Sequence, residues 1–185
     1  MPRKAIRETR YWWITASDKD PSHGWNWRQF FEAPDDPKQC FDFGGPDWIR
    51  SPVSRARIRE MCKGDIVAAY QAAEGIVGFV YLASDGYPQA PGGMHDSFDL
   101  RSKPTVWLKE PVPFQIVREL PDARENIEFV RARVKQGTVF RITERGFDGI
   151  VKMARSFNPS QTGEIRRFLS QSPRPAEAET LSVDD

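Results

Sequence analysis

Short apolar runs separated by turn residues dominate the chain, and they predict strands. Residues 11–16 read YWWITA, an aromatic and β-branched strand signal that ends at the polar turn segment SDKDPSHG. Residues 65–71 and 75–83 are apolar runs around the turn AAEG, which predicts an antiparallel hairpin. The segments VWLKEPVPFQIV and TVFRIT supply strand material later in the chain.

Helices are predicted between these strands by capping residues and apolar spacing. The best defined helix follows Ser51 as N-cap, with Pro52 in its first turn, Ile58 and Met61 facing inward and Gly64 after its end. Further helices are expected in three segments: residues 25–33, residues 127–134, and a helix that opens at Thr143 or Asp148 and continues through Ala154.

These elements predict an α+β domain with a small, curved, mostly antiparallel sheet or barrel and helices at its rim. The hairpin and the later strands lack the long helical crossovers that a parallel sheet requires. We expect residues 1–9 to form an N-terminal arm and residues 10–171 to form one domain. Residues 172–185 read SPRPAEAETLSVDD and are rich in proline and acidic residues, which predicts a disordered acidic tail.

The composition excludes several classes of protein. The 27 basic and 26 acidic residues leave a formal net charge of +1, so the chain is no histone-like polycation. Its hydrophobic content of 39% supports a core, but no run of about eighteen apolar residues occurs. We therefore expect no membrane contact and a cytoplasmic location.

Metal, cofactor and catalytic motifs are weak in this sequence. Cys40 and Cys62 lie in unrelated contexts without CxxC spacing, and only His23 and His95 could join them around a metal. Neither a phosphate-binding loop nor a dinucleotide fingerprint stands between a strand and a helix. These observations predict no metal site, no cofactor and no enzymatic activity.

Six motifs in order then suggest a family. They are YWWITAS at residues 11–17, Trp48 before a basic helix, MCKGDIVAAY, IVGFVYLASDGYP, Trp107 before VPFQIVREL, and ITERGFDGIV. In this order and spacing, residues 10–153 resemble the EVE domain, a PUA-like fold related to the YTH domain, which binds modified bases. The chain departs from the family in the insert 34–46 and at Ser51, where many relatives have Asn.

The resemblance implies a pocket for a planar base, in which an aromatic wall stacks and fixed polar groups discriminate. Trp48 is the first candidate wall, because it lies between a Gly-Gly-Pro turn and a basic helix; the alternative is a Trp that plugs the barrel end. Ser17 and Asp18 could meet a base edge at the end of the first strand, or be ordinary turn residues. Ser51 is placed near the pocket by the resemblance.

Other aromatic residues complete the prediction. Trp25 is a second candidate for the pocket, with core packing as its alternative. Tyr87 and Phe98 lie in a long loop, where the YTH domain places another wall of its cage, although this loop could instead fold back on the core. Three tryptophans within strands are interpreted as structural: Trp12, Trp13 and Trp107.

Basic residues crowd the helix that follows Trp48. Arg50, Arg55, Arg57 and Arg59 are candidates to hold phosphates beside a captured nucleotide, and a solvated helix face is the alternative. Their small number predicts modest, salt-sensitive affinity.

The resemblance therefore implies a monomeric, non-enzymatic module that captures a flipped modified base, a 5-substituted cytosine or a modified adenine, from DNA or RNA. Relatives occur with modification-dependent restriction systems, which implies a restriction or RNA-modification system as partner. Two alternatives stay open. One is a PUA-like or ASCH-like enzyme acting on a nucleoside or RNA, with Asp18 or Asp96 as its titrating group. The other is an interaction module whose aromatic residues bind a peptide.

Overall fold

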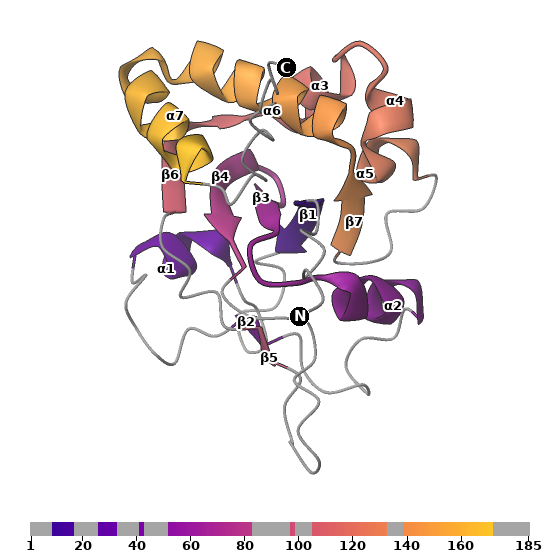
Figure 1. Ribbon diagram of the computed structural model, residues 1–185. Coiled ribbons are helices and arrows are strands. Elements are labelled where there is room, and N and C mark those ends of the chain that lie inside the picture. Colours follow the sequence, from indigo (N-terminus) through magenta and orange to yellow (C-terminus); the bar gives the residue numbers. More distant parts are fainter. Residues whose placement is uncertain are drawn as a thin grey trace, which may run out of the picture.

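The computed structural model describes residues 9–16, 26–32, 41–42, 52–82, 97–98, 105–132 and 139–171. Its centre is a five-stranded sheet in the order β6-β4-β3-β1-β7 (Figure 1). The strands are β1 (Tyr11–Ala16), β3 (Ile66–Gln71), β4 (Gly75–Tyr81), β6 (Thr105–Val112) and β7 (Val139–Ile142). A separate two-stranded pair joins β2 (Phe41–Asp42) to β5 (Ser97–Phe98).

The predicted α+β class is confirmed, but the predicted antiparallel barrel is not. Strands β3 and β4 form the expected hairpin, and β4–β6 and β1–β7 are also antiparallel. Strands β1 and β3, however, pair in parallel from Tyr11↔Ile66 to Ala16↔Gln71, so the sheet is mixed. It is also open, because β6 and β7 end the strand order at opposite edges. Parallel pairing is possible here because α1, α2 and the connecting segments separate the two strands in the chain.

Helices cover both faces of the sheet (Figure 1). One face carries α1 (Trp27–Glu32) and α2 (Pro52–Glu60). The other face is covered by the second half of the chain, in the following elements: α3 (Phe114–Arg118), α4 (Ala123–Asn126), α5 (Glu128–Arg131), α6 (Glu144–Phe157), the 3₁₀ helix η1 (Pro159–Gln161) and α7 (Thr162–Ser170). Among the described helices, none is long and apolar enough to cross a membrane.

Strand β1 divides the core into two clusters. Its side chains alternate between the faces of the sheet, so that Tyr11 and Trp13 join the cluster under α6, and Trp12 and Ile14 join the cluster under α1 and α2. Both faces are buried, which explains why the strand reads as a continuous apolar run. The tryptophans at 12 and 13 are 1% and 0% exposed, as the structural interpretation predicted.

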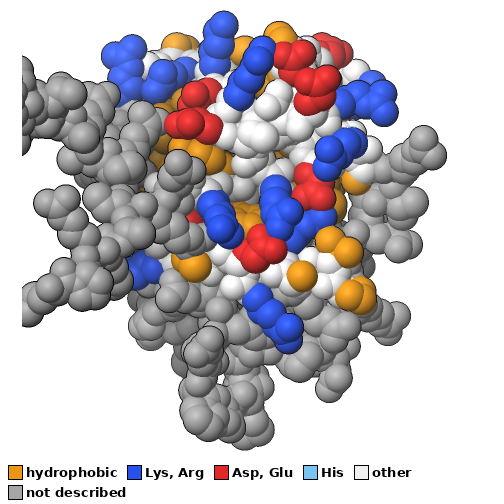
Figure 2. Space-filling model, turned by 45° about the vertical axis from the view of Figure 1, so that its right-hand side comes forward, with side chains coloured by type: hydrophobic (Ala, Val, Ile, Leu, Met, Phe, Trp, Pro, Cys, Tyr) orange, Lys and Arg blue, Asp and Glu red, His pale blue; other side chains and the backbone are white. Residues whose placement is uncertain are grey.

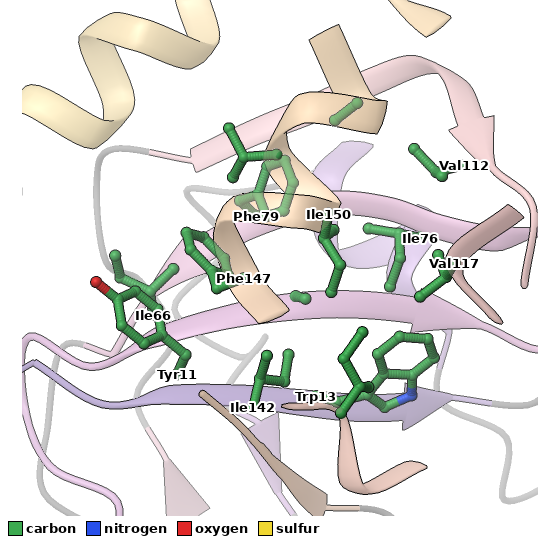
Figure 3. Close-up of a cluster of buried hydrophobic side chains, with 14 of the residues drawn as sticks. Tyr11, Trp13, Ile66, Ile76, Phe79, Val112, Val117, Ile142, Phe147 and Ile150 are labelled. Carbon is green, nitrogen blue, oxygen red and sulfur yellow. The ribbon is translucent and has the colours of Figure 1, made fainter. Parts of the chain in front are cut away.

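The larger cluster is rich in stacked rings (Figure 3). Trp13 stacks on Phe129 and Tyr70 with ring centroids 4.6 and 4.8 Å apart. Phe147 of helix α6 packs in this cluster and stacks on Tyr11, with ring centroids 4.5 Å apart. This helix begins as predicted at Thr143, whose hydroxyl accepts a hydrogen bond from the Gly146 N–H at 3.1 Å.

The edge strand β6 is closed by two side-chain amides. Asn158 Oδ1 accepts from the Glu110 N–H and its Nδ2 donates to the Glu110 carbonyl, both at 2.8 Å. Gln161 Oε1 accepts from the Lys109 N–H at 2.8 Å, and its Nε2 donates to the Trp107 carbonyl at 2.9 Å. The segment between α6 and α7 thus takes the place of a further strand.

Candidate nucleic-acid interface

The predicted phosphate-binding helix is α2, which lies beside β7. Figure 2 shows Lys and Arg side chains gathered there with acidic ones between them. Helix α2 begins at Pro52, as predicted, and buries Ile58 against the sheet, while Arg59 is exposed. Only the backbone of Arg55 is described.

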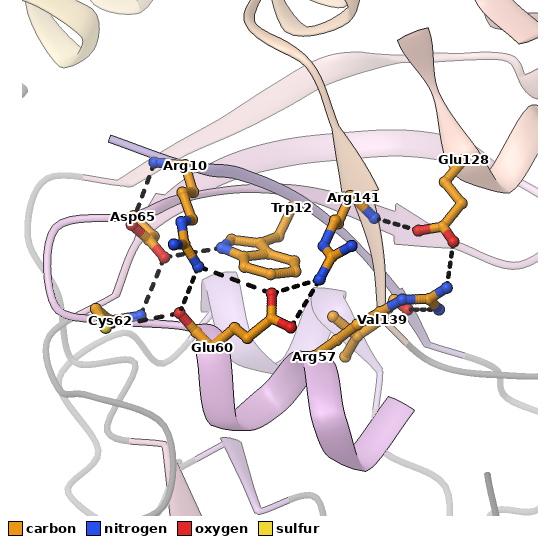
Figure 4. Close-up of polar contacts among 9 residues, drawn as sticks. All are labelled: Arg10, Trp12, Arg57, Glu60, Cys62, Asp65, Glu128, Val139 and Arg141. Carbon is orange, nitrogen blue, oxygen red and sulfur yellow. Dashed lines mark hydrogen bonds and ion pairs between the residues drawn. The ribbon is translucent and has the colours of Figure 1, made fainter. Parts of the chain in front are cut away.

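Glu60, the last residue of α2, lies between two arginines from distant parts of the chain (Figure 4). Both carboxylate oxygens accept from Arg141 Nη2 on β7, at 2.7 and 2.5 Å. Arg10, next to the start of β1, places Nη1 at 3.7 Å from Glu60 Oε2 and 3.4 Å from the Glu60 carbonyl oxygen. The side chains of Arg10 and Arg141 are 49% and 59% exposed, so this group belongs to the surface.

Arg57 has a different role from the one predicted for it. Its guanidinium donates to the Val139 carbonyl at 2.7 Å, is ion-paired with Glu128, and lies 5.3 Å from the centroid of the Phe140 ring. Only 12% of its side chain is exposed. These contacts place Arg57 in the edge of the sheet at β7, and we therefore remove it from the predicted phosphate ligands.

Asp65, five residues after the end of α2, is a buried acid whose carboxylate accepts several hydrogen bonds. The side chain is 2% exposed and accepts three hydrogen bonds: from the Arg10 backbone N–H at 3.2 Å, Trp12 Nε1 at 2.9 Å and the Cys62 backbone N–H at 3.0 Å. Three donors satisfy a carboxylate that burial alone would strongly disfavour. Asp65 therefore fixes the turn after α2 against β1, which holds the arginine surface in place.

Most of the predicted pocket lies outside the described residues. Of Phe98, in β5, only the backbone is described. The remaining members of the prediction all fall in segments outside the described ranges: Ser17, Asp18, Trp25, Trp48, Arg50, Ser51, Tyr87 and Asp96. Three described residues at or close to the ends of two of these segments, Ala16, Trp27 and Leu82, pack in the cluster under α1 and α2.

Trp107 differs from its structural interpretation. It is 41% exposed, and its ring stacks on Phe31 at 6.2 Å with an interplanar angle of 11°. A hollow of about 400 Å³ beside it is lined by residues of α1, β4 and β6 and by Gln161. Side chains alternate along β6, so Trp107 lies on the opposite face from its buried neighbours Val106 and Leu108, at the edge of the sheet.

Burial raises the pKa of Tyr70, which packs on Trp13 and therefore stays neutral. Among the described residues, no group of three or more His, Cys, Asp and Glu side chains could hold a metal ion.

Comparison with known proteins shows the fold. No family model matches the chain, and no curated protein matches it. The NMR structure of Rpa0253 from Rhodopseudomonas palustris aligns with a TM-score of 0.55 and 22% identity, over 79% of this chain and 93% of that one. The crystal structure of Atu2648 from Agrobacterium tumefaciens aligns with a TM-score of 0.57 and 19% identity, over 80% and 92%. Both are structural genomics targets, and the likeness shows that this chain shares their α+β fold.

Proposed function

We propose that this protein is a non-enzymatic nucleic-acid-binding module of the EVE type, which takes a flipped modified base into an aromatic pocket. The observation that carries the proposal is the gathering of exposed arginines from three separate segments, Arg10, Arg59 and Arg141, on the α2 side of the molecule. Guanidiniums brought together from distant segments suit the phosphates of a nucleic acid. The base would be a 5-substituted cytosine or a modified adenine, in DNA or RNA.

Chain connectivity links the proposed pocket to this surface. Trp48 precedes Pro52 by four residues, so its Cα lies within about 14 Å of the start of α2. Ser17 directly follows Ala16, and Trp25 comes two residues before Trp27. Because Ala16 and Trp27 pack in one cluster with Ile58 of α2, these pocket candidates are tethered to the face that carries the arginines.

Replacement of Trp48 tests the proposal most directly. If Trp48 stacks on the base, Trp48→Ala lowers the affinity for a modified oligonucleotide by about 1 to 3 kcal/mol, roughly 5- to 150-fold, and leaves thermal unfolding nearly unchanged. If Trp48 belongs to the core, the same change costs roughly 3 to 5 kcal/mol of stability instead.

Trp107→Ala is the matched control, since Trp107 is a half-exposed tryptophan on another strand and should leave base binding intact. Ser17→Ala should narrow the preference for the modified over the unmodified base, because a polar group at a base edge contributes selectivity more than stacking. A Trp48→Ala protein that melts early and binds normally would end the proposal.

The exposed ring of Trp107 favours the peptide-binding alternative over the enzymatic one. The hollow beside it offers Val77, Leu108 and Pro111 as apolar contacts, next to the ion pair of Arg28 with Glu74 at 2.9 Å. Proline-rich peptides bind to exposed aromatic grooves of this kind. Loss of a peptide ligand in Trp107→Ala, with no effect of Trp48→Ala on any oligonucleotide, would select this alternative.

A further inference from the structure

We propose that Arg10 and Arg141 form a phosphodiester site in which the Glu60 carboxylate occupies the place of the phosphate until nucleic acid displaces it. The inference rests on the proposed function and deepens it, because it names the residues that hold a phosphate flanking the captured base. Neither arginine belongs to the basic run 50–59 that the sequence singles out.

The geometry around Glu60 suits an exchangeable anion. Arg141 donates to both carboxylate oxygens, and Arg10 approaches Oε2 from the other side (Figure 4). Two guanidiniums converge on one anion here, Arg141 through Nη2 and Arg10 through Nη1, and such N–H donors also bind phosphate oxygens. A singly charged phosphodiester therefore matches the carboxylate in charge and in acceptors.

Glu60 also occupies an unfavourable position on its own helix. It is the last residue of α2, where the exposed carbonyl groups make the helix end negative and a carboxylate is disfavoured. The two arginines compensate for this position, and Arg10 additionally donates to the Glu60 carbonyl oxygen. A glutamate in this place holds the arginines apart and oriented, but gains little from the helix itself.

Exposure separates this site from the neighbouring ion pair. Glu60 is 39% exposed and its two partners 49% and 59%, whereas Arg57 and Glu128 are 12% and 22% exposed. Exposed ion pairs are weak and screened by salt, so a polyanion competes with Glu60 for both arginines. Arg57 stays bound to the backbone of Val139 and does not exchange.

The site lies at the C-terminal end of the predicted phosphate-binding helix. Helix α2 has nine residues and is therefore about 13 Å long, with Glu60 at its C-terminal end. The segment that contains Trp48 joins the helix at the opposite end. Under the proposed function, the phosphate held by Arg10 and Arg141 would be one that flanks the captured nucleotide.

The test uses Glu60→Gln in the full chain and a short single-stranded DNA without modified bases. Removal of the competing charge should raise the affinity about two- to fivefold at low salt, the range that corresponds to release from exposed ion pairs. It should also steepen the dependence of log K on log salt. Replacing Arg10 and Arg141 with alanine should lower the affinity and flatten that slope by about 0.7 for one lost phosphate contact.

Asp122→Asn is the matched control, because it also removes one charge and releases an exposed arginine, Arg145, but does so beside α4 and α6. Asp122 has φ of 56°, a conformation that asparagine tolerates. Its effect on affinity should be small, and the gain from Glu60→Gln should vanish when Arg10 and Arg141 are also replaced.

Two results would overturn the inference. One is an equal gain in Glu60→Gln and Asp122→Asn, which would reflect net charge alone. The other is early thermal unfolding of Glu60→Gln without any gain in affinity, which would make Glu60 a structural bridge between β1 and β7. The proposed function is judged separately, by the preference for modified bases and its loss in Trp48→Ala.

Discussion

The two edges of the central sheet are closed in different ways. At β6, the neutral amides of Asn158 and Gln161, 2% and 6% exposed, bond to the outer backbone groups of the strand. At β7, Arg57 donates to the Val139 carbonyl, and Glu128 Oε2 accepts from the Arg141 N–H at 2.9 Å. One edge thus depends on buried dipoles and the other on a charged pair beside an arginine-rich surface.

In both cases, backbone groups at the edge of the sheet have partners other than a further strand of the same sheet. Unpaired backbone groups at an edge must be satisfied by another strand, by side chains or by water. Here, side chains from α2, α5, η1 and the residue before η1 satisfy them, so neither edge needs the other. A change in ionic strength should therefore alter the contribution of the β7 edge to stability, but not the contribution of the β6 edge.

Breaking the amide edge should have the largest effect. Asn158→Ala removes three side-chain hydrogen bonds, two to the backbone of Glu110 and one to the Ala154 carbonyl at 3.0 Å. We expect a loss of about 3 kcal/mol in the free energy of unfolding, measured by chemical denaturation. Ser156→Ala, two residues earlier in the last turn of α6, removes one exposed hydrogen bond and should cost less than about 0.5 kcal/mol. Similar losses in the two variants would contradict the role assigned to Asn158.

Breaking the charged edge should cost less. Arg57→Ala removes the bond to Val139 and the pair with Glu128, and we expect a loss of about 2 kcal/mol. Arg59→Ala is the matched control, since Arg59 is exposed on the same helix and should change stability by under about 0.5 kcal/mol while weakening oligonucleotide binding. An Arg57→Ala protein of normal stability but reduced salt dependence of binding would return Arg57 to the phosphate ligands.

Local signals predicted several elements, but α3 falls in a segment predicted as strand, and α4 and α7 were not predicted. The turn of the β3–β4 hairpin, the start of α2 at Pro52 and the cap of α6 at Thr143 each depend on residues close together in the chain. Their physical causes are turn conformation and capping, which a short stretch of sequence contains.

The sequence alone did not predict which residues far apart in the chain pair in the fold. Glu128 and Val139, the partners of Arg57, lie 71 and 82 residues away from it in the chain. The contact of Arg141 with Glu60 depends on the strand register that places Trp12 opposite Arg141. The parallel pairing of β1 with β3 and the exposure of Trp107 likewise follow from the strand order. Of the predicted pocket itself, most residues lie outside the described ranges, and that part stays a prediction.

The smallest expected effect is a different dependence of the two edges' contributions to stability on salt concentration. Raising NaCl from about 0.1 M to about 1 M shortens the Debye length from roughly 10 to 3 Å, which weakens the pair of Arg57 with Glu128 but leaves amide hydrogen bonds unchanged. Because this pair is only 12% and 22% exposed and partly buried pairs are screened less, we expect the destabilisation by Arg57→Ala to shrink by only about 0.3 kcal/mol in high salt, while that by Asn158→Ala stays constant. Each value is a difference from the wild-type protein at the same salt, so the general effect of salt on apolar burial cancels. An equal change in both variants would mean that the β7 edge is held by its hydrogen bonds alone, and that its charges serve only the surface.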